Sequence, residues 1–187
     1  CYITSAGSAI DNGAMLCVFA STDKSKGSKG LSAFLVKGGT PGLTVSKIED
    51  KMGIRGSQTC ELVLENVRVP AENLLGQEGE GMKIAMKTLD SGRLMVAATG
   101  VGVGQRALDL AVEYVKNRMD GGKPFAKQQA VSFKLADMAA QVEAARLLVR
   151  RGAVLKDNGQ PYSHHSAITK LFATDMAMQV CRDAMDI

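Results

Sequence analysis

The stretch GMKIAMKTLDSGRLMVAATGVGVGQRALDLAVEYVKNR, residues 81–118, decides the fold of this 187-residue chain. Apolar side chains recur in it at helical spacing, which predicts one long amphipathic helix. The face that we expect to carry them comprises Ala85, Leu89, Val96 and Val103, then Ala107, Leu110 and Tyr114. At 1.5 Å per residue the helix would be about 57 Å long. Such a length predicts a bundle helix or two stacked pieces.

Two further helices are expected after this stretch. Gly121-Gly122-Lys123-Pro124 is a break, and Pro124 is well placed to open the next helix. That helix should run to about Asp157, and Ser163 is a plausible N-cap for a third one. The expected core stripe of the second helix is Leu135, Met138, Val142, Ala145 and Val149, and the expected buried side of the third is Ile168, Leu171, Phe172, Met176 and Val180.

The residues before the long helix have a different period. Short apolar runs separated by Gly and Pro clusters predict antiparallel strands at residues 15–20, 31–36, 43–48 and 60–64. Asp11-Asn12-Gly13 carries a hairpin-turn signal. We therefore predict an α+β chain: part of an antiparallel β domain followed by an antiparallel helical bundle, joined near residues 70–80.

Composition excludes several classes of protein. With 45% hydrophobic residues and a net charge of +4, the chain is not intrinsically disordered. It carries no basic stripe for nucleic acid and no uncharged run long enough to span a membrane. The four cysteines have no metal or framework spacing, so we expect free thiols in a reducing compartment. His164 and His165 are neighbours that point in different directions on a helix, and we expect no metal site there.

Three features of the long helix have two interpretations each. Gly100-Val-Gly-Val-Gly104 suggests a nucleotide loop, but close helix packing is the better account because no strand precedes it. Asp90 and Arg93 form either a surface ion pair or a polar patch that holds a ligand. Arg118 either complements the helix dipole or places a guanidinium against a phosphate.

Several motifs together resemble the acyl-CoA dehydrogenase family, in its short-chain, butyryl-CoA-dehydrogenase-like branch. They are EDKMGIRGS at residues 49–57, LVLENVRVPAENLLG at 62–76, GEGMK at 79–83, KTLDSGR at 87–93 and FKLADM at 133–138. The similarity covers essentially the whole chain, in order. It implies that residues 1–75 are the C-terminal part of a flavin-binding β domain and that residues 76–187 are a truncated C-terminal helical bundle.

The resemblance implies a flavoprotein oxidoreductase of fatty acid β-oxidation. Such an enzyme uses FAD to convert a short-chain acyl-CoA to the trans-2-enoyl-CoA and passes the electrons to an electron-transferring flavoprotein. We expect a homotetramer in the full-length protein, in a bacterial cytoplasm or a mitochondrial matrix, with neither nucleic acid nor membrane as a partner. Two alternatives stay open: an enoyl-CoA reductase of an electron-bifurcating complex, and an inactive family member that serves as a structural subunit.

The family's functional residues transfer only where this sequence matches its motifs. Tyr2, Ile3 and Thr4 resemble the strand that backs the flavin ring, while Arg118 and Gln129 match positions that hold the FAD of a neighbouring subunit. The segment Asp90-Ser91-Gly92-Arg93 resembles the one that lines the CoA-thioester channel, which favours the functional interpretation of Asp90 and Arg93.

Departures from the family pattern limit what this chain is expected to do. Asp120 and Gly121 replace a neutral polar residue and an aromatic one, so we expect weaker or altered FAD binding. A minority of the family has its catalytic glutamate at the position of Gly92, which cannot act as a base; we expect that glutamate beyond Ile187. Acyl chain length and branching stay open. The chain is expected to be an internal fragment that, alone, neither holds FAD well nor turns over.

Overall fold

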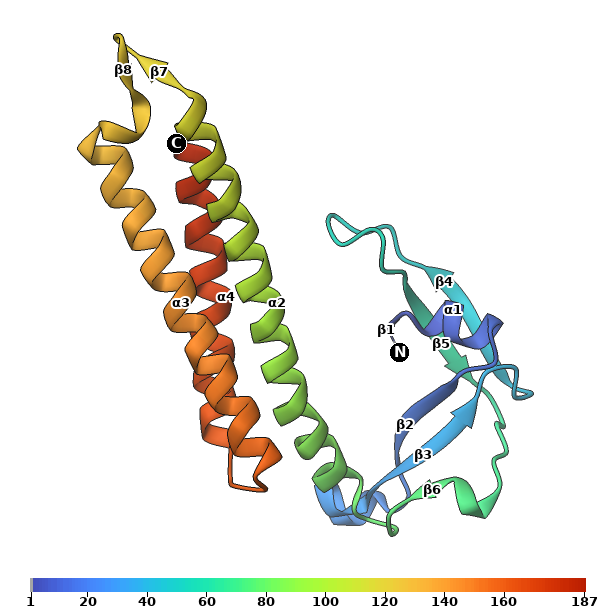
Figure 1. Ribbon diagram of the computed structural model, residues 1–187. Coiled ribbons are helices and arrows are strands. Elements are labelled where there is room, and N and C mark those ends of the chain that lie inside the picture. Colours follow the sequence, from blue (N-terminus) through green and yellow to red (C-terminus); the bar gives the residue numbers. More distant parts are fainter. Residues whose placement is uncertain (1) are drawn as a thin grey trace. The chain divides into compact units, whose positions relative to one another are not determined.

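The computed structural model describes the backbone of residues 2–187 and the side chains of residues 3–187 (Figure 1). The chain forms two compact units, one ending at Met86 and one beginning at Lys87. Antiparallel sheets make up the first unit and long helices the second, which confirms the predicted fold class. The division falls within α2 (Gly81–Asn117), so the domain limits 1–75 and 76–187 stay predictions.

The first unit contains two three-stranded antiparallel sheets. One has the order β1-β5-β4 and the other β2-β3-β6. The strands are β1 (Tyr2–Thr4), β2 (Met15–Ser21), β3 (Leu31–Lys37), β4 (Leu43–Ile48), β5 (Thr59–Leu64) and β6 (Leu74–Leu75), and the 3-10 turns are η1 (Lys24–Gly30) and η2 (Ala71–Asn73). The four strands predicted from apolar runs are confirmed to within one residue. Their core contains Ala6, Val36, Leu43, Cys60 and Leu62.

The hairpin predicted at Asp11-Asn12-Gly13 is wrong. A short helix, α1 (Ala6–Asp11), fills this segment instead, and Asn12 closes it by donating from its side-chain Nδ2 to the Ser8 carbonyl at 2.8 Å. Gly13 has a φ of 65°, the left-handed conformation common just past a helix end. An Asn-Gly pair supplies this conformation equally well to a hairpin and to a helix terminus, which explains the error.

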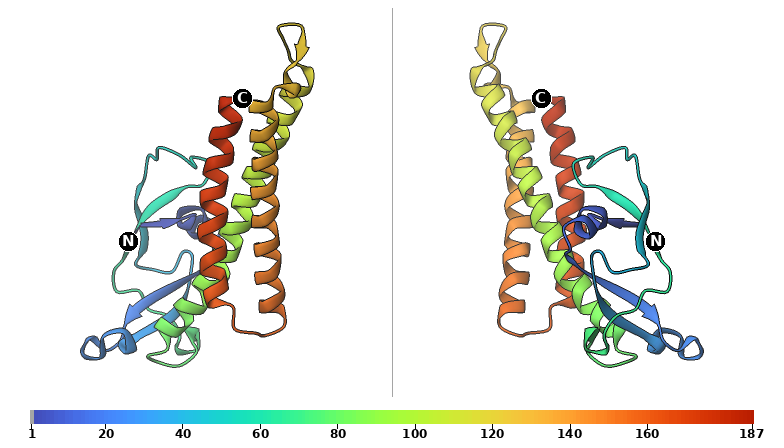
Figure 2. Two further views of the ribbon diagram at one scale, coloured as in Figure 1. Left: turned by 90° about the vertical axis from the view of Figure 1, so that its left-hand side faces the viewer. Right: turned by 90° about the vertical axis from the view of Figure 1, so that its right-hand side faces the viewer.

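Three long helices form the second unit and lie side by side (Figure 2). They are α2, α3 (Gln129–Asp157) and α4 (Ser163–Asp186). The 37 residues of α2 form one uninterrupted helix. A Cβ added to Gly100 would lie 2.8 Å from the Ala173 carbonyl oxygen of α4, and one added to Gly104 would lie 2.9 Å from the Met176 sulfur. These two glycines therefore permit close helix packing, as predicted.

The buried face of α2 differs from the predicted one, and the prediction for α4 is confirmed at Met176 and Val180 but not at its other three residues. The large apolar residues expected on one face of α2 are about half exposed, as with Leu89, Val96 and Val103, and Ile168, Leu171 and Phe172 of α4 are exposed too. The buried positions of α2 are Leu94, Ala97, Val101, Leu108, Ala111 and Val115; those of α4 include Ser166, Thr169, Ala173, Met176, Ala177 and Val180. The buried faces mix large residues with small ones such as Ala97, Ala111 and Ala173, while other large apolar side chains are exposed, so side-chain size alone does not predict the buried face. The α3 stripe is confirmed, with Met138, Val142 and Ala145 buried.

The two connections between helices are set by glycines with positive φ. Gly121 (54°) and Gly122 (75°) form the two-residue turn of a hairpin between β7 (Met119–Asp120) and β8 (Lys123–Pro124). The 3-10 turn η3 (Phe125–Lys127) follows, so α3 begins at Gln129 rather than at Pro124 as predicted. At the other end of α3, Gly159 (65°) donates to the Lys156 carbonyl and Gln160 to that of Leu155, the paired bonds of a Schellman motif.

Candidate functional site

Asp90, Ser91 and Arg93 lie near the start of α2, in a half-buried position. The Nη1 group of Arg93 donates to Oδ1 of Asp90 at 2.7 Å, and the two side chains are 39% and 18% exposed. This pair follows the i,i+3 spacing predicted for a helix surface. Its partial burial strengthens the attraction over that of a fully solvated pair. The guanidinium has five N–H donors, so the bond to Asp90 leaves most of its hydrogen-bonding capacity for other groups.

The residues that enter α4 extend this cluster. The Ser163 hydroxyl donates to the same Asp90 Oδ1 at 3.0 Å, and the Tyr162 hydroxyl shares a 2.9 Å hydrogen bond with the Ser91 hydroxyl. Ser163 was predicted to cap α4, but Tyr162 occupies the N-cap position and no side chain caps this helix. The Ser163 hydroxyl bonds to α2 instead. We call Asp90, Ser91, Arg93, Tyr162 and Ser163 the α4-entry cluster.

Gly92 lies within this cluster's segment of α2 and has open space beside it. A Cβ built at Gly92 would have no neighbouring atom within 4 Å. Packing therefore does not require glycine at this position, and a Cβ would fit without a steric clash. As the sequence indicates, Gly92 itself supplies neither an acid nor a base.

Arg118 follows the end of α2 and is held between two aromatic rings. Its guanidinium carbon lies 5.2 Å from the ring centre of Tyr114 and 4.6 Å from that of Phe125, both within the range of cation–π attraction. Its Nη1 group also donates to the Tyr114 hydroxyl. The Phe125 amide donates to the Arg118 carbonyl at 2.9 Å. These contacts fix an exposed positive charge at the hairpin end of the bundle.

Gln129, the other residue predicted to hold FAD, is the first residue of α3 and is exposed. No side chain caps this helix, so N–H groups of its first turn are available to an anion. Asp120, one of the two residues expected to weaken or alter FAD binding, accepts a hydrogen bond from Nε2 of Gln128 at 2.5 Å. The bond connects the hairpin carboxylate to the residue just before α3. We call Arg118, Asp120, Phe125, Gln128 and Gln129 the hairpin cluster.

The strand predicted to back the flavin ring is present as β1. It pairs antiparallel with β5, with Ile3 opposite Cys60 and Thr4 opposite Thr59. Ile3 is 41% exposed and Thr4 is exposed, so both side chains are accessible. The predicted role of Tyr2 rests on a side chain outside the described ones.

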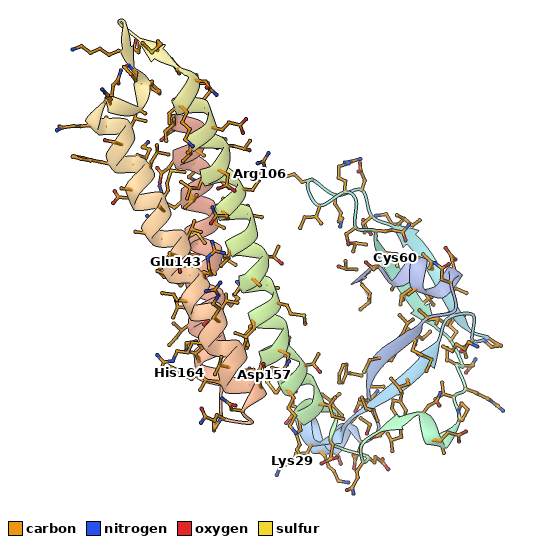
Figure 3. All side chains as sticks on the ribbon, viewed as in Figure 1. Lys29, Cys60, Arg106, Glu143, Asp157 and His164 are labelled. Atoms are coloured by element: carbon orange, nitrogen blue, oxygen red, sulfur yellow. The ribbon has the colours of Figure 1, made fainter. Side chains whose placement is uncertain are left out.

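The two histidines lie at the start of α4 and differ in their surroundings. Figure 3 shows His164 projecting outward from the start of α4, and the neighbouring His165 lies with its Nε2 atom 2.9 Å from the Leu148 carbonyl oxygen. Among the described residues, no group of three or more His, Cys, Asp or Glu side chains is placed to hold a metal ion. Within the same residues, no helix is both long and apolar enough to cross a membrane.

The structure thus brings the predicted residues together at two places in the helical unit. Asp90, Ser91 and Arg93 join Tyr162 and Ser163, while Arg118 and Gln129 belong to the hairpin cluster. The two places are about 40 Å apart along α2, at 1.5 Å per residue. Sequence reasoning missed Tyr162 and assigned Ser163 a different bond. A serine after Pro161 signals a helix start, but no linear pattern connects residue 163 with residue 90.

Two family models match the chain. The acyl-CoA dehydrogenase middle domain matches residues 1–67, and the acyl-CoA dehydrogenase C-terminal domain matches residues 79–187. Together they cover most of the sequence in the order β unit, then helical unit.

Curated relatives with high identity align over nearly all of the chain. A short-chain specific acyl-CoA dehydrogenase of Megasphaera elsdenii is 53% identical over 186 residues, which are 100% of this chain and 48% of that protein. The mitochondrial short-chain specific enzyme of Rattus norvegicus is 52% identical over 91% of this chain and 41% of its own length. An acryloyl-CoA reductase (NADH) of Anaerotignum propionicum is 46% identical over 100% of this chain and 46% of its own. The chain therefore spans about half the length of the curated relatives it matches.

Solved structures agree with these matches. Butyryl-CoA dehydrogenase from Megasphaera elsdenii superposes with a TM-score of 0.94 at 53% identity, over 99% of this chain and 47% of that one. A second match is a chain in a structure of the electron transferring flavoprotein of Acidaminococcus fermentans, which concerns flavin-based electron bifurcation. Its TM-score is 0.89 at 52% identity, over 92% of this chain and 45% of that one. The structure of PigA with FAD and proline has a TM-score of 0.90 at 31% identity, over 98% of this chain and 47% of the PigA chain.

Proposed function

The chain belongs to the acyl-CoA dehydrogenase family, and from this premise we propose that it is about half of an FAD-dependent enzyme that dehydrogenates a short-chain acyl-CoA. The reaction removes hydrogen from Cα and Cβ of the acyl group and yields the trans-2-enoyl-CoA. The observation that carries the proposal is the 53% identity to a short-chain specific relative over the whole chain, combined with a TM-score of 0.94 to a butyryl-CoA dehydrogenase.

In this proposal the two parts of the chain have different tasks. Residues 1–75 are the C-terminal part of the flavin-binding β domain, in which Tyr2, Ile3 and Thr4 of β1 back the flavin ring. Residues 76–187 are a truncated C-terminal helical bundle, which contributes the acyl-CoA channel and an FAD-binding surface for a neighbouring subunit. The order of the two matching family domains supports this division.

The hairpin cluster fits an FAD group. The Arg118 guanidinium is held in place by two rings, Gln129 is exposed, and the uncapped start of α3 offers backbone N–H groups to a pyrophosphate. Asp120 opposes this binding through the negative charge of its carboxylate, which the hydrogen bond from the neutral Gln128 amide does not remove. We therefore retain the hypothesis of weaker FAD binding than in relatives with a neutral residue there. When bound, FAD supplies the two-electron oxidation.

Asp90, Ser91, Gly92 and Arg93 are proposed to line the channel for the CoA thioester. Arg93 binds oxygen atoms of the acyl-CoA with the N–H groups that its bond to Asp90 does not use, and Asp90 fixes the direction of that guanidinium. Ser91 presents a hydroxyl already held by Tyr162. These groups bind and orient the substrate, which brings the α-proton into a fixed position for removal.

The base that removes the α-proton is proposed to be a glutamate outside these 187 residues, beyond the position of Ile187. Gly92 is the one place in the channel segment where a minority of the family would carry it, and that position has no side chain here. On this account the 187-residue piece retains residues for substrate and cofactor but lacks the proton acceptor. We expect it to retain FAD poorly and to show no turnover.

The test is to express the full-length protein, reconstitute it with FAD and measure butyryl-CoA oxidation with an artificial electron acceptor. We expect bleaching of the flavin absorbance by butyryl-CoA and formation of the enoyl product. A series of linear and branched acyl-CoA thioesters then defines the acyl group. A reconstituted protein whose flavin no acyl-CoA reduces would refute the proposal, and measurable turnover by the 187-residue piece alone would refute the placement of the base.

A second candidate is the reverse reaction, reduction of an enoyl-CoA. It is favoured by the acryloyl-CoA reductase at 46% identity and by the chain in the flavin-based bifurcation structure at 52%. The same comparison supports an electron-transferring flavoprotein as the redox partner in either direction. Measuring initial rates in both directions with that partner would separate the two candidates.

The remaining expectations follow from family membership. We propose a homotetramer that functions in fatty acid β-oxidation, located in the cytoplasm of a bacterium or in a mitochondrial matrix, as its bacterial and mitochondrial relatives suggest. A third alternative, an inactive family member, depended on Asp120 and Gly121. Both residues have a structural role in the hairpin, so neither of them by itself favours loss of activity.

A further inference from the structure

The start of α4 bonds to two neighbouring residues of α2 that lie more than seventy positions earlier in the chain. Ser163 bonds to Asp90 at 3.0 Å and Tyr162 to Ser91 at 2.9 Å. Both contacts use side-chain hydroxyls rather than packing of apolar surface. Two hydrogen bonds to adjacent residues fix a direction as well as a distance, because each hydroxyl constrains a different side chain.

The Ser163 hydroxyl does not cap α4, although serine commonly has this role at the start of a helix. A serine at a helix start usually accepts a bond from a backbone N–H of the first turn. Here the Ser163 hydroxyl donates to a carboxylate instead, and α4 has no side-chain cap. A bond to an ionised acceptor is roughly twice as strong as a neutral one, which offsets the lost cap. The negative charge of Asp90 also lies near the positive end of the α4 dipole.

One oxygen atom connects the serine with the arginine. Oδ1 of Asp90 accepts from both Ser163 and Arg93, so the rotamer of Asp90 sets the position of the guanidinium. Without Ser163, Asp90 retains Arg93 alone among its partners in the described part of the chain, and its side chain is less restrained. The Ser163–Asp90–Arg93 chain therefore transmits the position of α4 to a charged group on α2.

We propose that Tyr162 and Ser163 are positioning residues for acyl-CoA binding: Ser163 holds Arg93 through Asp90, and Tyr162 holds the hydroxyl of Ser91. This inference rests on the proposed function, in which Ser91 and Arg93 contact the acyl-CoA. It adds that substrate affinity depends on the start of α4. That segment lies outside the motif at residues 87–93 from which the substrate residues were predicted. Arg93 and Ser91 touch the substrate, and Tyr162 and Ser163 act through them.

The experiment compares Ser163→Ala, Ser163→Thr and Tyr162→Phe in the full-length FAD-loaded protein. Calorimetric titration of the oxidised protein with crotonyl-CoA, the enoyl product, which cannot reduce the flavin, gives the Kd, and steady-state assays with butyryl-CoA give KM and kcat. We expect Ser163→Ala to raise Kd and KM about fivefold with little change in kcat, and Tyr162→Phe to raise them about threefold. Ser163→Thr keeps the hydroxyl and should retain wild-type affinity.

Two controls separate positioning from a general loss of stability. Thr174→Val removes a hydroxyl from the middle of α4 that bonds only to the carbonyls of Lys170 and Leu171, and it should leave the Kd unchanged. Asp90→Ala removes the connecting carboxylate, so adding Ser163→Ala to it should cause no further loss of affinity. A ligand-free crystal structure of Ser163→Ala should show Asp90 and Arg93 in altered or multiple rotamers.

The outcomes distinguish the two claims. A wild-type protein that does not bind butyryl-CoA or any other acyl-CoA overturns the proposed function and, with it, the substrate role of these residues. A wild type that binds normally, with variants that lower the melting temperature but leave Kd unchanged, overturns the positioning role alone. So does equal loss from Ser163→Ala in the wild-type and Asp90→Ala backgrounds.

Discussion

The two ends of the helical unit are held by different kinds of contact. At the α4-entry cluster, Ser163 bonds to Asp90 and Tyr162 to Ser91, residues more than seventy positions apart. In the hairpin cluster, Arg118 contacts Phe125 and Asp120 contacts Gln128, all within an eleven-residue segment. The contacts of the α4-entry cluster form only when α2 and α4 pack together. The hairpin cluster is formed by a short stretch of chain around a Gly-Gly turn.

The difference indicates how each end should respond to change. A shift of α4 relative to α2 breaks long-range hydrogen bonds but leaves a local hairpin unaffected. A change of backbone conformation at the turn does the opposite. Because the proposed substrate residues lie at the first end and the proposed FAD residues at the second, the two binding functions should be separable by mutation.

The strongest expected effect comes from Gly100, at the crossing of α2 and α4. Gly100→Ala places a Cβ 2.8 Å from the Ala173 carbonyl oxygen, which is backbone and moves only with α4. Because the blocking atoms belong to the backbone, we expect overpacking at the upper end of the usual range, about 3 kcal/mol, offset in part by about 1 kcal/mol of helix propensity. Gly102→Ala, with no atom within 4 Å, is the matched control and should be stabilising by up to about 1 kcal/mol.

Denaturant titration of the full-length protein measures both glycine variants, and hydrogen exchange shows where they act. Gly100→Ala should speed exchange at the start of α4 and leave residues 119–124 unchanged. Equal stability of the Gly100→Ala and Gly102→Ala variants would contradict the close crossing as the basis of the α4-entry cluster.

A smaller loss of stability is expected at the hairpin, where the change acts on the backbone of a local turn and not on the packing of two helices. Gly121 has a φ of 54°, so Gly121→Phe, which restores the family's aromatic residue, forces a β-carbon into the left-handed region at a cost of about 1–2 kcal/mol. Gly121→Asn should cost less, because asparagine tolerates this conformation. Hydrogen exchange should increase at the hairpin and not at Tyr162 or Ser163.

Flavin retention after gel filtration extends this test to FAD binding. If Gly121 weakens the cofactor site, Gly121→Phe changes the fraction of FAD retained while Gly121→Asn does not. Unchanged retention in Gly121→Phe would refute the hypothesis that this departure alters FAD binding.

The smallest effect concerns a long-range ion pair near the hairpin end. Lys134 of α3 lies 3.0 Å from Asp186 and 3.7 Å from Asp183 of α4, and its bond to Asp186 raises the pKa of Lys134 above its ordinary value. A raised folded-state pKa stabilises the fold below the unfolded value, about 10.4, and this contribution is lost as pH rises through the folded value.

Lys134→Met should therefore lower the melting temperature slightly at pH 8, and the difference from the wild type should decrease as the pH rises above about 10.4 and through the raised folded value. Because the pair is exposed, added salt should reduce the difference as well. A constant difference between pH 8 and pH 11 would show that packing of the lysine stem, and not its charge, is responsible.

Local signals in the sequence predicted the elements well. Turn residues and apolar period placed four strands, three helices and their breaks, because these depend on neighbours along the chain. Errors arose where one local signal serves two structures. Asn12-Gly13 ends a helix instead of forming a hairpin, and Pro124 ends a strand instead of opening a helix.

Faces and contacts between helices were predicted less well. The large residues Leu89 and Val96 were expected on the packed side of α2, but Ala97 and Val101 are buried there. Periodicity reports that a helix has an apolar face, but α2 has two, and only the shape of the neighbouring helices selects between them. Ser163 and Tyr162, the partners of Asp90 and Ser91 at the start of α4, were missed because they too depend on how the helices pack.

The sequence by itself determined the elements, the family and the residue types available for binding. These follow from local backbone preferences and from motifs that are contiguous along the chain. The tertiary structure decided which α2 face is buried, that Ala173 and Met176 lie against Gly100 and Gly104, and that Tyr162 and Ser163 bond to Ser91 and Asp90. Those outcomes depend on distances between segments remote in sequence, which are set only when the helices pack.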